Sequence, residues 1–248
     1  MDATDDSRVK FGFNSQDVIK EALRLSPKVL LSFSCGKDSI GAYLAIRDAG
    51  FEDIVGYYMM QVPGNLSFIE ESLDYYERTL FGGRRIIRVP HPFIARAMQR
   101  AVLQPPERLD LIKEMDFESF TAQDLSASIA DWLGWPETTL TAVGVRATDS
   151  QNRYSMFKKR GMGVAVNQSN GKFYPVFDWN KDKLLTEINK AGVKLPVDYR
   201  LFGKTFDGLD LRFIAPLKKH FPADYEKLRF WWPMIDVELF RYEHRQEA

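Results

Sequence analysis

The sequence predicts an α/β protein with a mostly parallel, doubly wound sheet of about five strands and helices on both faces. Short apolar runs alternate with segments of helical periodicity, and the first run ends in a loop of small residues. With 248 residues, 45% of them hydrophobic, the chain can bury a substantial core. We expect an α/β domain over residues 1–200, with a helical insertion at about 95–135, and a helical C-terminal extension over 201–248 that packs on it.

The first part of the chain alternates between the two kinds of element. The expected order is helix 15–25 with Ser15 as its cap, strand 29–31, a helix from residue 38 to Gly50, strand 54–60, helix 66–80 and strand 84–89. The first two strands and the helix between them form a β-α-β unit, which predicts a parallel pair. Ligands of such sheets lie beyond the carboxyl ends of the strands.

The second part begins with the insertion, near whose end Trp132 and Trp135 are expected to pack against the core. Residues 138–145 are rich in β-branched side chains and predict a further strand. A hairpin-like turn at SNGK precedes the segment FYPVFDW, residues 173–179, and a helix is expected at 181–191.

The stretch VLLSFSCGKDSI, residues 29–40, predicts a buried strand, a tight turn and the start of a helix. Small residues let backbone N–H groups converge on an anion, and the positive end of the helix dipole points to the same place. The common nucleotide loop G-x-x-x-x-G-K-[ST] does not fit, because Leu31 stands at its first glycine and Asp38 follows Lys37. The alternative is a simple helix start at which Asp38 or Ser39 caps free backbone donors.

The segment SFSCGKDS resembles the S-x-G-x-D-S pyrophosphate loop (PP-loop) of the N-type ATP pyrophosphatases. With a lysine before the aspartate, the loop is similar to that of the branch that contains the phosphoadenosine phosphosulfate (PAPS) reductases and the small ATP-using subunit of sulfate adenylyltransferase. The resemblance implies an adenine nucleotide alpha hydrolase-like fold. It also implies that ATP with Mg²⁺ is cleaved between the α and β phosphates. The implied phosphate-binding residues are Ser32, Ser34, Gly36, Lys37, Asp38 and Ser39.

A second segment, GVRATDSQNR, resembles the G-x-R-x-x-[DE]-S-x-x-R motif of the same branch, through Gly144, Arg146, Asp149, Ser150 and Arg153. A glycine at a strand end lets backbone approach a ribose or phosphate, and arginines suit anionic ligands. The alternatives are an ion pair between Arg146 and Asp149 and a solvated charge at Arg153.

Two further segments have weaker counterparts in the branch. FYPVFDW resembles its P-[IVL]-x-D-W segment, in which Asp178 has an alternative explanation as a helix N-cap. Gly64 follows the second strand, where a glycine of the family meets the nucleotide. Because Val62 and Pro63 depart from the family's pattern there, an ordinary turn glycine is an equal alternative.

The resemblance implies that Lys37, Asp38 and Arg146 are catalytic. Lys37 would offset charge on the β and γ phosphates, and Asp38 would help to hold Mg²⁺. Arg146 and Arg153 would orient the α-phosphate or an acceptor whose identity the sequence does not give. Gly64 and Gly144 complete the predicted nucleotide site.

Cys35 is the single cysteine, which excludes an internal disulfide, a cysteine-built zinc site and a four-cysteine iron–sulfur cluster. PAPS reductases use a cysteine near the C-terminus, where this chain reads RYEHRQEA, so sulfonucleotide reduction is disfavoured. A sulfonucleotide-binding enzyme with a separate redox or GTPase partner remains an alternative. Another is a nucleotide-controlled subunit of a nucleic-acid modification system, with contacts from Arg84, Arg85, Lys158, Lys159 and Arg160.

Charge and hydropathy limit the kinds of partner that we expect for this chain. Lys plus Arg and Asp plus Glu both number 34, so no global field attracts nucleic acid or anionic membranes. The N-terminal MDATDDSRVK lacks the basic start and apolar core of a signal peptide, and no apolar stretch approaches the roughly 20 residues of a membrane span. We expect a cytoplasmic protein without membrane contact.

Overall fold

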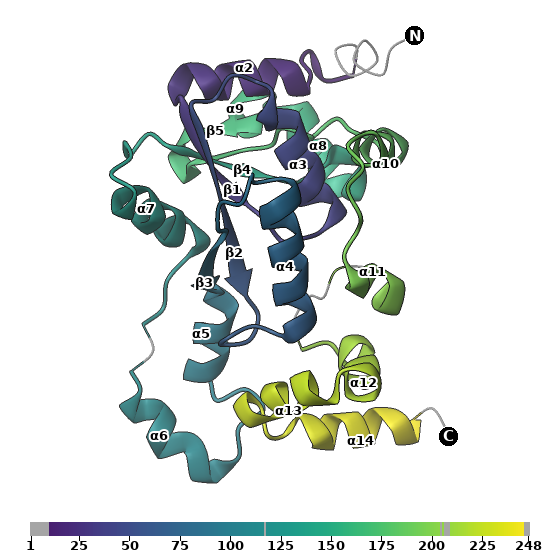
Figure 1. Cartoon of the computed structure of the whole chain (residues 1–248). Coiled ribbons are helices and arrows are strands. Elements are labelled where there is room, and N and C mark those ends of the chain that lie inside the picture. Colours follow the sequence, from purple (N-terminus) through teal and green to yellow (C-terminus); the bar gives the residue numbers. More distant parts are fainter. Residues whose placement is uncertain (1–9, 117, 204, 206–208, 246–248) are drawn as a thin grey trace. The chain divides into compact units, whose positions relative to one another are not determined.

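The structure is a computed structural model that describes residues 10–245, except 117, 204 and 206–208. It is an α/β protein with a mostly parallel, six-stranded sheet in the order β3-β2-β1-β4-β6-β5 (Figure 1). The strands are β1 (Lys28–Ser32), β2 (Asp53–Met60), β3 (Ile87–Pro90), β4 (Leu140–Val143), β5 (Val166–Asn167) and β6 (Lys172–Phe173).

The contacts between residues divide the chain into two compact units. The first comprises Met1–Tyr58, Glu77–Ile87 and Gln123–Leu195, and the second comprises Met59–Tyr76, Arg88–Ala122 and Pro196–Ala248. Most of the expected insertion and the expected C-terminal extension thus belong to the same unit. The expected packing of that extension on the α/β domain stays a prediction.

Most of the predicted helices are present with nearly the expected bounds. Helices of the first unit are α2 (Ser15–Leu25), α3 (Lys37–Arg47), α7 (Ala122–Trp132), α8 (Gln151–Arg160), α9 (Met162–Ala165) and α10 (Lys181–Lys190). The helix α4 (Ser67–Thr79) runs from the second unit into the first, and those of the second are α5 (Pro92–Gln99), α6 (Leu109–Glu114), α11 (Val197–Phe202), α12 (Leu211–His220), α13 (Pro222–Trp231) and α14 (Ile235–Arg245). None of the described helices is long and apolar enough to cross a membrane.

The sheet has one strand more than expected. The pairs β1–β2, β1–β4 and β4–β6 are parallel, whereas β5 and β6 form an antiparallel pair around the SNGK turn. Each strand of that pair has only two residues, too few for an alternating pattern to be visible in the sequence. The central strand β1 is completely buried at Val29, Leu30 and Leu31, as its apolar run predicts.

The second unit is built from helices around a buried aromatic core that includes Trp232. The carboxylate of Asp224, on α13, accepts hydrogen bonds from the backbone N–H of Ser67 at 2.8 Å and from its hydroxyl at 2.7 Å. This buried side chain therefore satisfies donors at the start of α4. The exposed large apolar residues of this unit lie mainly on α6, α13 and α14.

Two expectations and one alternative explanation about single residues are wrong. The N-cap of α2 is Asn14, whose side chain accepts from the backbone N–H groups of Gln16 and Asp17. Asp178 does not cap α10, because Asn180 does so by accepting from Lys183 N.

The third concerns Trp132, which is 75% exposed on α7 instead of packing in the core. Trp135 is half-buried, with the ammonium group of Lys28 5.7 Å from its ring centroid. Apolar character alone does not show which face of a short helix is covered.

Ser15 and Asp178, which do not cap their helices, are hydrogen-bonded to each other. The carboxylate of Asp178 accepts from the backbone N–H of Ser15 at 3.1 Å and also from its hydroxyl. This contact ties the start of α2 to the segment before α10.

We expect Asp178→Ala to lower the free energy of unfolding by about 1–3 kcal/mol, because two donors at Ser15 lose a charged acceptor. Asp131→Ala, at an exposed position on α7, is the matched control and should change it by less than about 0.5 kcal/mol. Urea unfolding of the two variants measures the difference. Equal losses would show that the bond to Ser15 stabilises nothing.

Candidate active site

The loop between β1 and α3 closes on itself through Ser39. The hydroxyl of Ser39 donates to the carbonyl of Gly36 at 2.8 Å and accepts from the backbone N–H of Ser34 at 3.2 Å. Cys35 is buried in the turn and has a φ of +61°. A non-glycine residue in this region costs of order 1–3 kcal/mol, and such residues cluster at functional sites. Cys35 is therefore part of the tight turn, as a small side chain was expected to be.

The start of α3 is not capped in the way the alternative explanation requires. Its N-cap is Gly36, which makes no side-chain capping hydrogen bond. Asp38 instead forms ion pairs, and Ser39 bonds within the loop. The first turn of a helix presents backbone N–H groups and a positive dipole end, both of which favour an anion. Because Lys37 stands beside them, the loop has the features of an anion site.

Two neighbouring strands bring the two motifs together. Strand β4 pairs in parallel with β1, with Ser32 opposite Val143, so the loop after β1 and the segment after β4 emerge at the same edge of the sheet. The strand order changes direction here, because β2 and β3 continue on one side of β1 while β4 lies on the other. Open α/β sheets bind ligands at such a switch point.

Gly144 allows the close approach of these two segments. A Cβ at this position would lie 2.4 Å from the carbonyl oxygen of Asp38 and 2.8 Å from the backbone nitrogen of Ser39. Any side chain would therefore collide with the first turn of α3. The structure thus gives Gly144 a packing role, while a contact of its backbone with a nucleotide stays a prediction.

Charged side chains from both motifs form a continuous row, which we call the charged row. Lys37 Nζ lies 2.6 Å from Asp38 Oδ2, and Asp38 Oδ1 lies 2.7 Å from Arg146 Nε. Arg146 also contacts Asp149 at 2.8 Å, and Asp149 contacts Arg153 at 2.8 Å. The row contains three cations and two carboxylates, so it carries a net positive charge.

The charged row is buried at its centre and open at its ends. The Arg146 side chain is 8% exposed, whereas that of Lys37 is 22% and that of Arg153 is 45% exposed. Lys37 and Arg153 are therefore the cations that a bound anion can reach most easily. Arg146 forms the ion pair with Asp149 that was considered as an alternative, and it holds Asp38 as well.

The ion pair between Asp38 and Arg146 joins two buried atoms. Asp38 Oδ1 and Arg146 Nε lie 2.7 Å apart, so each is the charged partner of the other. Burying either charge would be costly without the other.

The remaining predicted residues are placed differently. Ser32 lies in the sheet opposite Tyr57, and its hydrogen bond with the Tyr57 hydroxyl partly offsets the rise in the pKa of that tyrosine caused by burial. Gly64 belongs to the second unit and has a φ of +73° in a turn that Asn65 N closes on Val62 O at 2.9 Å. Its geometry suits a turn glycine, and its nucleotide contact stays a prediction.

The basic residues considered for nucleic acid have local explanations. Arg84 pairs with Asp53, and the mostly exposed Arg85 lies 3.7 Å from Glu77. Lys158, Lys159 and Arg160 lie in the last turn of α8, where positive charge complements the helix dipole.

Asp149 is the functional candidate that the sequence did not single out. It was matched to the motif, but its position between two arginines depends on the turn Ala147–Asp149, in which the backbone N–H of Arg146 donates to its carboxylate at 3.0 Å. A carboxylate three residues after one arginine and four before another was the available signal.

Comparison with known proteins does not assign the chain to a family. No family model matches the sequence, and a search of curated proteins finds no match.

We expect Gly144→Ala to lower the free energy of unfolding by about 1–3 kcal/mol, because the new Cβ would meet backbone atoms that cannot turn aside. Gly163→Ala is the matched control, since a Cβ there meets nothing within 4 Å. Urea unfolding measures both variants. A Gly144→Ala protein as stable as the control would contradict the close approach of β4 to α3.

Proposed function

We propose that this chain is a PP-loop ATP pyrophosphatase resembling the PAPS reductase branch. It would bind ATP with Mg²⁺ and cleave it between the α and β phosphates to adenylylate or activate an acceptor. The observation that carries the proposal is the ion-paired contact of the two motifs: Lys37 and Arg146, from different strand ends, share the carboxylate of Asp38. The residues meet at the switch point of the sheet, where α/β proteins bind ligands.

We further propose that the sheet is doubly wound and adenine nucleotide alpha hydrolase-like. The change of direction between β1 and β4 supports this view. A reaction that consumes ATP also agrees with the cytoplasmic location expected from the sequence.

In the proposed reaction, a nucleophilic atom of the acceptor forms a bond to the α-phosphorus. The bond from that phosphorus to the bridging oxygen breaks, and the electron pair leaves with pyrophosphate. Negative charge therefore grows on the departing β and γ phosphates. The ammonium group of Lys37 and the backbone N–H groups at the start of α3 offset this charge.

We propose that a magnesium ion is held mainly by the substrate. No group of three or more His, Cys, Asp or Glu side chains suited to a metal occurs in the described part of the chain. Mg²⁺ is commonly bound through one or two carboxylates together with phosphate oxygens and water, and Asp38 would supply such a carboxylate through Oδ2 in place of its contact with Lys37. The ion would neutralise phosphate charge.

The charged row assigns different roles to its two arginines. Arg146 is buried between Asp38 and Asp149, so we propose that it holds the Asp38 carboxylate in position and contributes positive potential. Arg153 is nearly half exposed and can reach outward, so it is the better candidate to orient the α-phosphate or the acceptor.

The first test incubates the protein with Mg²⁺ and ATP labelled at the α-phosphate, and separates the nucleotide products. We expect AMP, or a labelled adenylylated acceptor when cell extract is added, together with pyrophosphate. Formation of ADP and phosphate would overturn the proposed cleavage.

The second test is Lys37→Ala, which removes the cation placed to offset charge on the leaving group. We expect turnover to fall at least about 100-fold, while circular dichroism shows the same fold. Lys159→Ala, an exposed lysine in the last turn of α8, is the matched control and should keep full activity. Unchanged turnover in Lys37→Ala would remove this lysine from the mechanism.

A further inference from the structure

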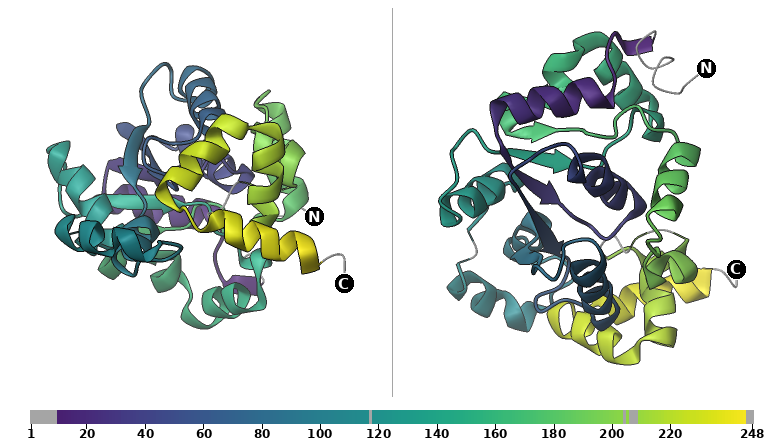
Figure 2. Two further views of the ribbon diagram at one scale, coloured as in Figure 1. Left: turned by 90° about the horizontal axis from the view of Figure 1, so that it is seen from below. Right: turned by 45° about the horizontal axis from the view of Figure 1, so that its top comes forward.

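A groove lies between α2, α3 and α10, apart from the candidate active site. It has a volume of about 620 Å³, within the range of about 300–1,000 Å³ typical of small-molecule sites. In Figure 2 (right), the dark blue α3 lies between the purple α2 and the green α10. The groove is lined by the second half of α3, whereas the charged row adjoins its first turn.

Two contacts, one on each side of the groove, hold the helices that form its walls. A Cβ at Gly41 would lie 2.2 Å from Leu184 Cδ1, so α3 and α10 are packed closely there. On the other side, Asp178 binds the start of α2 through Ser15. Because both contacts lie within the first unit, the groove belongs to one folded body.

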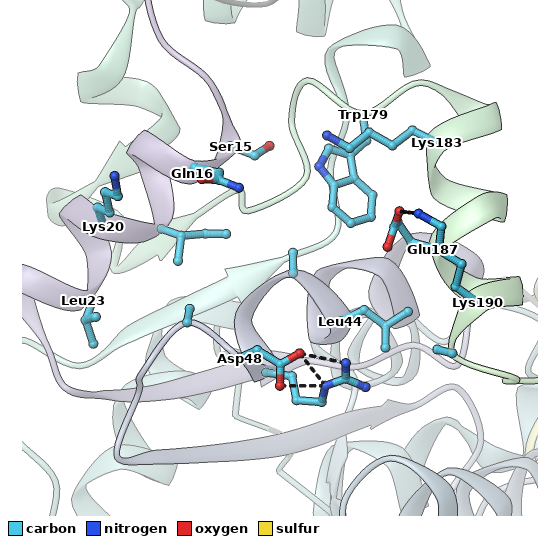
Figure 3. A pocket seen from close by; sticks show the side chains of 15 residues that line it. Ser15, Gln16, Lys20, Leu23, Leu44, Asp48, Trp179, Lys183, Glu187 and Lys190 are labelled. Carbon is cyan, nitrogen blue, oxygen red and sulfur yellow. Dashed lines mark hydrogen bonds and ion pairs between the residues drawn. The ribbon is translucent and has the colours of Figure 1, made fainter. Parts of the chain in front are cut away.

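Apolar side chains make up about half of the lining of the groove, and one of them forms an aromatic wall. The indole of Trp179 faces the groove across from α2, as Figure 3 shows. The other apolar lining residues are Ile19, Leu23, Leu44, Ala45, Ala49 and Ala191. Such a surface suits an aromatic ring or a short hydrocarbon group.

The polar lining of the groove carries an excess of positive charge. Arg47 is paired with Asp48 at 2.7 Å, and Lys190 with Glu187 at 2.8 Å. Lys20 and Lys183 also line the groove, and no carboxylate lies within ion-pair distance of either among the described residues. Lys183 Nζ lies 5.0 Å from the centroid of the Trp179 ring, so a cation stands directly above the aromatic wall.

We propose that this groove binds a small aromatic or apolar molecule that carries negative charge. The apolar lining would take up the ring or hydrocarbon part, and the ammonium group of Lys183 would bind the anionic group beside it. The proposal does not depend on the ATP reaction, because no residue of the charged row lines the groove.

Anilinonaphthalene sulfonate is a suitable probe, since it is an aromatic anion whose fluorescence rises in apolar surroundings. Phenylnaphthylamine has the same rings without the sulfonate and tests the contribution of charge. We expect saturable binding of one sulfonate probe per chain and weaker binding of the neutral probe. The experiment contains no nucleotide, so its result is separate from that of the ATP tests.

The variant Lys183→Glu should raise the Kd of the sulfonate probe about tenfold and change that of the neutral probe much less. Lys181→Glu makes the same charge change on the same helix outside the groove lining, and should leave both unchanged. Ala45→Phe places a ring in the groove and should abolish binding of both probes.

Several results would overturn the proposal. They are equal affinity for the two probes, equal effects of Lys183→Glu and Lys181→Glu, or unchanged binding in a folded Ala45→Phe protein. A dimer that Lys183→Glu dissociates would show instead that a second copy of the chain fills the groove. If Ala45→Phe does not fold, the comparison of the two lysine variants decides the question by itself.

Discussion

The candidate active site depends on the close approach of the end of β4 to the first turn of α3. Only a residue without a side chain can stand at Gly144, because its Cα faces the backbone of Asp38 and Ser39. This approach brings Arg146 within 2.7 Å of Asp38. The first turn of α3 therefore receives a guanidinium group from another strand in addition to its own lysine, and the loop and the second motif become one electrostatic unit.

The charged row balances two opposing requirements. Bringing cations together for an anionic ligand is unfavourable when the ligand is absent, and burying Arg146 is costly without carboxylate partners. Asp38 and Asp149 offset both costs, yet they leave the row with a net positive charge. An anion would reach Lys37 and Arg153 at the exposed ends, while the buried centre stays paired.

The sequence was sufficient to predict the α/β class and the approximate bounds of the elements that it placed, because strand ends and loop chemistry leave local signals. That the two motifs share one site was implied by the family resemblance. It was not sufficient for β5 and β6, whose two residues each show no period. Asn14 and Ser15 are both good caps, and only the extended backbone at Asn14 decides between them. The groove lined from three helices depends on tertiary distances, which no local pattern contains.

The buried position of Cys35 has a practical consequence. It is the single thiol of the chain and sits inside the turn that Ser34, Gly36 and Ser39 close. A thiol reagent can therefore modify the chain at one place, and only when that turn opens. The rate of alkylation of the unmodified protein becomes a measure of how often the loop opens, and its slowing by an added compound reports occupancy of the loop without any engineered label.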